Sequence, residues 1–297
     1  MADYTTTALL ARCRLWTASS SGTPPSVSDI DLLDILNEEL RSVITPLIMT
    51  FNSDYLVAYE DKVLDLVTAE WALPARAIFG KLRETKIYDQ GSRSYVNLPL
   101  MNLESLDNIR DRYGCYFTGN TLTIVNPEIY GVGKVLRMYY YQRPSDLVAV
   151  ASAGTVTTID RVLGTVVISG TPSAWSGSFT ADCVQGRPPF GVIGKDLSVS
   201  IATNTLTFSP ASTIPATLVV GDYVALPQES PVPTIPLELH NLMCQGASVK
   251  VLEISADAQG VQMALAKYQQ MMKSVQSMGQ SRITGQPRVI VPRNTFT

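Results

Sequence analysis

The sequence predicts an α+β protein: a helical bundle built from the two chain ends, a small β domain, and an inserted antiparallel β barrel or sandwich. Three observations predict this class. Apolar residues recur at helical spacing near both ends, short β-type runs fill the middle, and residues 145–228 are rich in Val, Thr, Ser, Gly and Ala but poor in charge. A chain of 297 residues can bury a substantial core without disulfide or metal cross-links.

Residues 1–54 are predicted to form the N-terminal helices. A Ser-, Gly- and Pro-rich loop at 19–26 separates two helical patterns, and Ser28 with Asp31 three residues later occupies capping-box positions. Apolar residues then follow at spacings of three and four over 33–47. The acidic residues of this segment suit the positive end of a helix dipole, so we do not interpret them as a paired-carboxylate active site.

Residues 55–144 are predicted to form a small β domain, with a short helical piece at 103–112. Gly119-Asn120 lies between two apolar runs and predicts a hairpin turn. Tyrosines dominate the strongest strand pattern, which Pro144 ends. The strands expected here cover 62–73, 94–98, 115–125 and 135–142.

Residues 145–230 are predicted to be an inserted barrel or sandwich domain. Short Val- and Thr-rich runs alternate with Gly, Asn and Pro signals at the spacing typical of compact antiparallel folds. Four prolines between 227 and 236 mark its exit. Because both tethers enter the same body, we expect the two ends of this domain to lie close together.

Residues 231–279 are predicted to supply the C-terminal helices. Apolar positions alternate spacings of four and three from His240 to Val275, which resembles a coiled-coil seam. Gly260 disfavours a helix interior, so both one long helix and a helical hairpin remain open for 237–278. We expect the seam to pack on the N-terminal helices, with four of its residues buried against Leu33, Leu36 and Leu40: Val251, Ile254, Val261 and Leu265.

Charge is distributed unevenly along the chain. The formal net charge is −3, but the five basic residues after Asp257 have no acidic neighbours, which leaves 18 basic and 26 acidic residues, a net of −8, for the first 257. An acidic body with a basic end is not typical of a nucleic-acid-binding domain. It indicates an end that binds an acidic partner.

No catalytic, cofactor-binding or metal-binding constellation emerges from the sequence. His240 and Cys244 are spaced as two metal ligands would be on a helix, but both lie on the apolar seam and no second ligand pair accompanies them. His240 is also the only histidine, and no G-x-S-x-G nucleophile elbow is present. Tyr139–Tyr141 would suit a base-stacking platform, but we interpret them as strand residues alternating between core and interface.

Cysteines and hydropathy bear on the cellular compartment. The four cysteines (Cys13, Cys115, Cys183, Cys244) show no paired spacing, so we predict reduced thiols in a protein that folds in the cytosol. No charged segment followed by an apolar run opens the chain, and no run approaches the length of a membrane span. We therefore expect neither a secretion signal nor a membrane partner.

Three segments in this order resemble a known family. They are DLVTAEWALPARAIFGKLRETKI (65–87), the tyrosine-rich strand ending in YQRP (141–144), and IPLELHNLMCQGASVKVLEISADAQGVQMALAKYQQMM (235–272). This order resembles the head-to-tail adaptor proteins of tailed bacteriophages, of the podovirus-type connector group. The resemblance covers about residues 5–143 and 232–290, and its motifs are Leu73-Pro74-Ala75-Arg76 and Pro236-Leu-Glu-Leu-His240. The insertion at 145–228 departs from the smallest members of that family.

The resemblance implies a structural virion protein rather than an enzyme. It implies a homo-oligomeric ring, dodecameric in that family, between the portal protein and a tail or nozzle protein, with double-stranded DNA passing non-specifically through the channel. It also implies a location at the virion neck or tail after assembly in the host cytoplasm. The family's C-terminal tails dock onto the portal.

The final segment, residues 280–297, is expected to be that portal-binding tail. Prolines at 287 and 292 disfavour a helix, and three valine or isoleucine residues in a row would supply apolar contact in an extended segment. Arginines would pair with carboxylates of the partner. The residues expected to bind the portal are Arg282, Arg288, Val289, Ile290, Val291 and Arg293.

Two other classes of function remain open from the sequence. One is a different structural subunit of the tail, such as a nozzle, baseplate or receptor-binding protein, in which the β insertion would make the functional contact. The other is a hydrolase with a β-sandwich carbohydrate-binding module. The sequence offers no convincing pair of acids at strand ends for glycoside hydrolysis, which disfavours the hydrolase.

Overall fold

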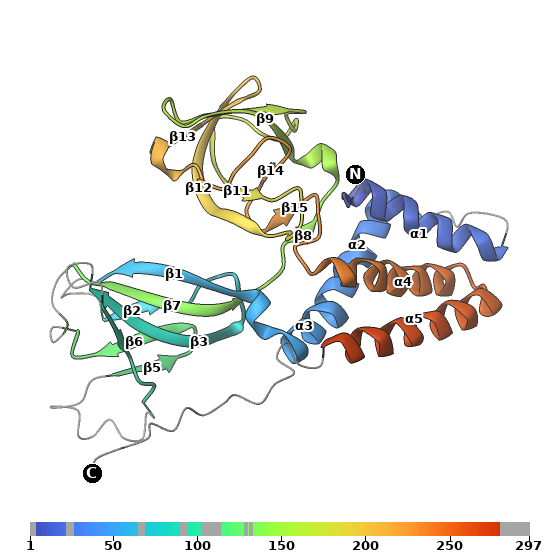
Figure 1. Cartoon of the computed structure of the whole chain (residues 1–297), viewed down its shortest axis with the longest axis horizontal. Helices are drawn as coiled ribbons and strands as arrows, with labels where there is room; N and C mark the ends of the chain where they lie inside the picture. Colours follow the sequence, from blue (N-terminus) through green and yellow to red (C-terminus); the bar gives the residue numbers. More distant parts are fainter. Residues whose placement is uncertain are drawn as a thin grey trace, which may run out of the picture.

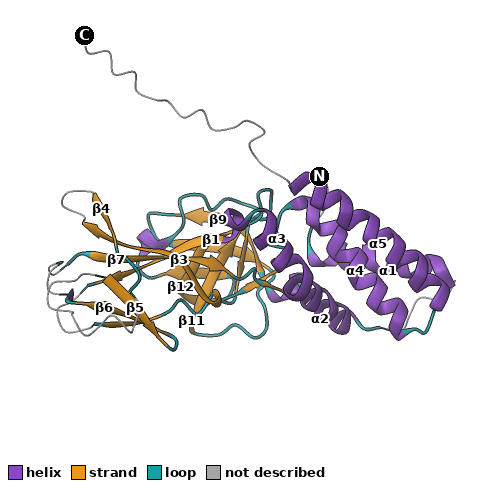
Figure 2. Ribbon diagram, turned by 90° about the horizontal axis from the view of Figure 1, so that it is seen from below, coloured by secondary structure: helices purple, strands orange, loops and turns teal. Residues whose placement is uncertain are grey.

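A computed structural model describes residues 4–21, 27–64, 69–89, 94–101, 114–127, 130 and 133–279. The predicted α+β class is confirmed: helices occupy one end of the molecule, a pair of small sheets another, and a β barrel lies beside both (Figures 1 and 2). The helices are α1 (Thr6–Ser21), α2 (Asp29–Glu39), α3 (Thr45–Phe51), α4 (Leu237–Ile254) and α5 (Ala258–Gly279).

The α2 helix begins at the predicted cap. The side chain of Ser28 accepts a hydrogen bond from the backbone N–H of Asp31, as the capping pattern indicates. A π-helical turn, Leu40–Ile44, joins α2 to α3. Pro46 follows this turn, and because proline has no N–H to continue the regular ladder, a local widening of the helix there has a direct cause.

Helices from the two chain ends contact one another. The α4 helix packs against α1 and α2, and a shared apolar cluster includes Leu36, Leu40, Leu242 and Val251. Glu39 is buried among these helices, where its carboxylate accepts a hydrogen bond of 2.6 Å from the hydroxyl of Tyr268 on α5. The interior of this part therefore holds a hydrogen-bonded acid beside buried polar side chains such as Gln245 and Ser248.

The C-terminal segment is a hairpin of two helices, which decides between the two alternatives for 237–278, and the predicted burial of Ile254 and Leu265 is wrong. Ala256 adopts φ +56°, and a carboxylate oxygen of Asp257 accepts the N–H of Gly260 at 2.9 Å, so the chain turns and α5 runs back beside α4 (Figure 1). Of the four seam residues expected to be buried, Val251 is buried and Val261 partly buried, whereas Ile254, the last residue of α4, is 65% exposed and Leu265 is 41% exposed. The later seam residues Tyr268, Met272 and Val275 pack on the core.

The β domain consists of two small antiparallel sheets around one apolar cluster. A four-stranded sheet has the order β1-β7-β3-β4, and a three-stranded sheet has the order β2-β6-β5. The predicted hairpin at Gly119-Asn120 is confirmed between β5 and β6. The strands are β1 (Val57–Val63), β2 (Glu70–Ala72), β3 (Ala77–Asp89), β4 (Ser94–Asn97), β5 (Gly114–Thr118), β6 (Thr121–Val125) and β7 (Val135–Gln142).

One predicted strand of this domain is wrong. The run expected at 62–73 belongs to two strands in different sheets, because β1 pairs with β7 and β2 pairs with β6. The β1 strand ends at Val63 and β2 begins at Glu70. The short helical piece expected at 103–112 lies outside the described residues.

The predicted insertion contains a closed antiparallel barrel with the strand order β10-β13-β12-β11-β14-β9, which decides between barrel and sandwich. Its interior is a separate apolar cluster. Two short parallel strands, β8 (Asp146–Leu147) and β15 (Glu229–Ser230), lie side by side where the chain enters and leaves it. The barrel strands are β9 (Gly154–Asp160), β10 (Thr165–Ser169), β11 (Ser178–Val184), β12 (Val192–Ala202), β13 (Thr205–Phe208) and β14 (Tyr223–Ala225).

Candidate functional site

The residues predicted to bind a portal protein lie outside the described part of the chain. Arg282, Arg288, Val289, Ile290, Val291 and Arg293 all follow Gly279, where the description ends. Their role therefore stays a prediction. The described residues instead direct attention to the junction between the β domain and the barrel.

An ion cluster with a buried Arg76–Asp182 pair and an exposed Asp196 joins the barrel to the β domain. Arg76, in the loop before β3, donates to both carboxylate oxygens of Asp182 at 2.6 and 2.8 Å. It also donates to both oxygens of Asp196 at 2.6 and 3.1 Å. Asp182 is fully buried and also accepts the backbone N–H groups of Asp196 and Gln228. Such bidentate pairs fix orientation as well as position, so this cluster holds the barrel in one orientation on the sheet.

Burial opposes the positive charge of Arg76, but its hydrogen bonds to the two aspartates outweigh that effect. The pKa of the guanidinium is accordingly raised above its usual value. Arg76 is the last residue of the Leu73–Arg76 motif that carries the family resemblance. The sequence alone does not show which acidic residues pair with it. Asp182 and Asp196 lie more than a hundred residues further along the chain.

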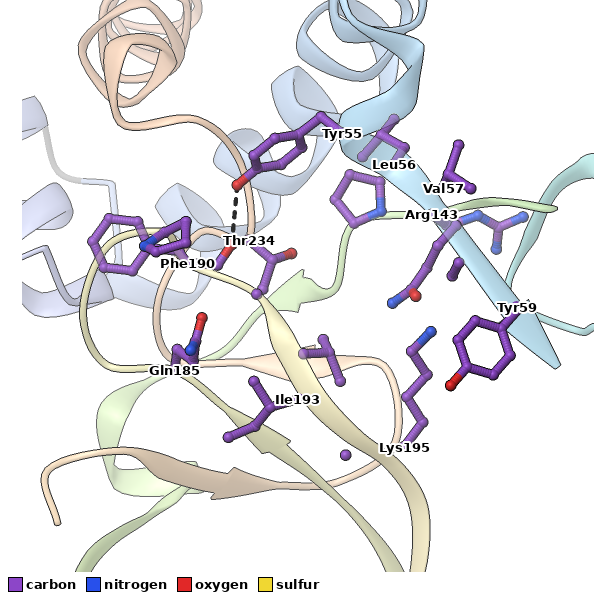
Figure 3. Close-up of a pocket in the computed structure, with 17 residues that line it drawn as sticks. Tyr55, Leu56, Val57, Tyr59, Arg143, Gln185, Phe190, Ile193, Lys195 and Thr234 are labelled. Atoms are coloured by element: carbon purple, nitrogen blue, oxygen red, sulfur yellow. Dashed lines mark hydrogen bonds between the residues drawn. The ribbon is translucent and has the colours of Figure 1, made fainter. Parts of the chain in front are cut away.

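A cleft of about 610 Å³ opens beside this cluster, between the start of the four-stranded sheet and the barrel (Figure 3). One wall is formed by residues 55–59, which lead into β1, and the facing wall by residues 189–195, which lead into β12. The hydroxyl of Tyr55 donates to the backbone carbonyl of Phe190 at 3.0 Å and connects the two walls at one end. At the other end, Lys195 and Tyr59 project into the opening from opposite walls.

Lys195 has an unusual environment for a lysine. Desolvation, followed by the positive charge of Arg76, lowers the pKa of its amine to about 8, although Asp182, Asp196 and Glu60 act in the opposite direction. Its nitrogen lies 5.5 Å from the centroid of the buried Tyr140 ring. The amine therefore titrates close to neutral pH at the edge of an open cleft.

Little in the sequence points to Lys195. It lies in the β-rich segment 145–228, which was set apart by its low charge, and the run IGKDLSVSI breaks its apolar alternation with two charged residues. This pair of charges in a charge-poor segment is the one sequence feature that could have pointed to Lys195. Lys195 faces a cleft only because β1 forms the opposite wall, and the position of β1 is known only from the fold.

The tyrosine-rich strand is a second candidate surface. Tyr140 is buried while Tyr139 and Tyr141 lie on the opposite face, which confirms the predicted alternation along β7. On that face Arg137 lies 4.2 Å from the centroid of the Tyr59 ring and donates to both carboxylate oxygens of Asp61 at 2.7 Å. Because its charge is already paired within the sheet, we interpret this face as a structural cation–π network.

The candidate His240–Cys244 pair is buried in the helical part. The rings of His240, Tyr4 and Phe190 pack as a triangle, with the His240 centroid 5.8 Å from Tyr4 and 5.2 Å from Phe190, and Tyr4 5.4 Å from Phe190. One His240 ring nitrogen is 3.3 Å from the carbonyl of Ile235. Burial lowers the pKa of His240 to about 4. The Cys244 carbonyl accepts a hydrogen bond from the thiol of Cys13. Among the described residues, no group of three or more His, Cys, Asp or Glu side chains is arranged to hold a metal ion.

All four cysteines are free thiols, as predicted. Burial raises the pKa of Cys183 to about 12, and the nearby Asp182 and Asp222 add to that shift. A thiol that stays protonated is a poor nucleophile. Cys183 is therefore a core residue of the barrel rather than a reactive group.

Within the described ranges between 4 and 279, no helix has the length and apolar character needed to cross a membrane. No protein-family model and no curated protein sequence matches this chain.

Proposed function

We propose that this protein is a structural subunit of a tailed-bacteriophage virion, a head-to-tail adaptor that forms a ring between portal and tail. The helices from the two chain ends would form the bundle that makes the ring body. DNA would pass through the ring without sequence-specific contacts. The partners of this assembly are further copies of the chain, the portal protein and a tail or nozzle protein.

The observation that carries this proposal is the separation of charge along the chain. Every charged residue after Asp257 is basic, while the rest has a net charge of −8. Electrostatic complementarity of this kind gives orientation and specificity in protein assembly more than raw affinity. We assign portal binding to residues 280–297, with Arg288 and Arg293 setting the orientation.

The Arg76 cluster supports a structural role. An assembly subunit must keep its parts in one relative orientation, because small rotations within each copy would accumulate around a ring. Two bidentate contacts and the paired entry strands β8 and β15 supply that rigidity between barrel and sheet.

A second candidate is another tail subunit, such as a nozzle, baseplate or receptor-binding protein, whose barrel makes the outer contact. The turn between β9 and β10 favours it, because Val162 is 91% exposed and Leu163 70% exposed. Adjacent exposed apolar side chains on a loop are typical of contact surfaces.

Electron microscopy and light scattering of the purified chain, with and without a portal protein, test the proposal. We expect particles much heavier than one 32.3 kDa chain, and attachment to the portal. A chain ending at Gly279 should remain folded but lose attachment. Charge reversal of Arg288 and Arg293 should weaken attachment in a salt-sensitive way, while the control Lys273→Glu should not. Failure of the full chain to bind any portal, with binding to a distal tail protein, would favour the second candidate.

A further inference from the structure

Two strand segments with unpaired edges border the cleft. The β1 strand is at the edge of its sheet and pairs only with β7 within the described ranges. The β12 strand pairs with β11, but its contact with β13 begins only at Val199. Residues 192–195 of β12 therefore present one edge without a strand partner among the described residues, whereas the N–H of Asp196 donates to Asp182 and the C=O of Ser198 accepts the N–H of Ser209. Free N–H and C=O groups on such edges are a template for an added strand.

The side chains at the cleft are cationic and apolar. Lys195 and Arg143 line it, no acidic residue does, and neither cation forms a salt bridge with any residue that the structure describes. Val57 and Ile193 contribute partly buried apolar surface on opposite walls. A ligand that suits this lining carries negative charge and alternates it with apolar side chains.

The walls are held in place before any ligand binds. The Arg76 cluster fixes the barrel, and the Tyr55–Phe190 hydrogen bond connects both walls at one end (Figure 3). A site that needs no rearrangement loses less free energy on binding. The walls offer free backbone N–H and C=O groups. A helical ligand could not pair with them, because its own N–H and C=O groups are hydrogen-bonded within the helix, so an extended ligand fits the site better.

We propose that this cleft binds an extended, acidic segment of a partner protein by β-strand addition to β1 or β12, with Lys195 and Arg143 contacting its carboxylates. The chain's own basic end is the wrong ligand, since Arg288 and Arg293 would meet two unpaired cations. The inference does not depend on the virion role, because it uses only the geometry and charge of the cleft.

Lys195 also makes binding depend on pH. Its amine has a pKa of about 8 in the free protein, and a carboxylate in contact would raise that value, so binding takes up a proton. While the ligand's carboxylates stay ionised, above about pH 5, affinity is therefore nearly constant up to pH 8 and falls as the pH rises further. Asp182, Asp196, Glu60 and Arg76 are the other charged groups that act on this amine, and they are present with or without ligand.

Fluorescence anisotropy with labelled peptides tests the proposal on the full chain. The probe is a peptide of about eight residues that alternates valine and glutamate, and the controls are a valine–lysine peptide and a peptide of residues 280–297. We expect the acidic peptide to bind best. Lys195→Met should weaken its binding about tenfold at pH 7, whereas the matched control Lys81→Met, on β3 outside the cleft, should not.

A second variant separates charge from titration. Lys195→Arg keeps a cation that does not titrate, so it should bind at pH 7 and lose the decline in affinity between pH 7 and 9. Arg143→Gln should weaken binding but keep that decline. Thermal unfolding of each variant establishes that it is folded.

Hydrogen exchange locates the ligand. Strand addition should slow amide exchange in 57–63 or 192–195 when the acidic peptide is bound. Equal binding of the acidic and basic peptides, unchanged binding by Lys195→Met, or an absence of protection in both segments would each overturn the proposal. If the 280–297 peptide binds more tightly than the acidic peptide, the occupant is the chain's own end and the proposal is wrong. If these segments are protected from exchange without peptide and lose that protection on dilution, the occupant is a second copy of the chain.

Discussion

The buried imidazole of His240 predicts that this protein loses stability in mild acid. His240 is 1% exposed, and one of its ring nitrogens, Nδ1, has no hydrogen-bond partner among the described residues. Burial is the largest cause that lowers its pKa to about 4, and the nearby Arg12 acts in the same direction. The hydrogen bond to Ile235 opposes the shift without reversing it.

The size of the effect follows from proton linkage. The unfolded chain binds a proton at His240 with a pKa near 6.5, whereas the folded chain binds it only near 4. Between these values the unfolded state carries more protons, so stability falls as the pH falls from 6.5 towards 4. At pH 5 the loss from this one group, relative to pH 7.5, is roughly 2 kcal/mol.

Urea unfolding at pH 5 and pH 7.5 measures this loss in wild type and in His240→Phe, which keeps an aromatic ring but cannot titrate. We expect the drop in unfolding free energy to be roughly 2 kcal/mol larger in wild type, because other acidic groups contribute equally to both proteins. The chain has a single histidine, so its imidazole resonance also reports the pKa directly by NMR. Equal drops in the two proteins, or an imidazole that titrates near 6.5, would refute the reasoning.

Two further predictions concern stability and are measured by denaturant unfolding at neutral pH. Arg76→Met should destabilise the protein by about 3–5 kcal/mol because it leaves Asp182 charged and buried, whereas the exposed ion-paired Arg83→Met should cost less than about 1 kcal/mol. Leu252→Ala should cost about 2–5 kcal/mol at a side chain that is 2% exposed, and Leu265→Ala, at 41%, much less. If the two variants of either pair lost the same unfolding free energy, the difference in burial that the prediction uses would be wrong.

The local elements of this fold were largely readable in the sequence. Ser28 caps α2 where the capping pattern placed it, Gly119-Asn120 makes the hairpin turn, and β7 has the predicted limits Val135–Gln142. These features depend on residues within a few positions of one another. Short Val- and Thr-rich runs with turn signals likewise predicted an antiparallel barrel or sandwich, because alternation and turn chemistry are properties of neighbouring residues.

The tertiary structure decided everything that depends on distant residues or on geometry between elements. The three-and-four spacing counted Ile254 and Leu265 into the seam as if the helix were continuous. Ile254 instead ends α4 just before the turn at Ala256 and is exposed, and Leu265 is also exposed, whereas Tyr268 and Val275 further along α5 pack on the core. The ion cluster joins Arg76 to Asp182 across a separation of 106 residues, which no local pattern encodes. The lowered pKa of Lys195 likewise requires the burial that barrel and sheet create together, because desolvation belongs to the assembled surroundings of a side chain and not to its sequence neighbours.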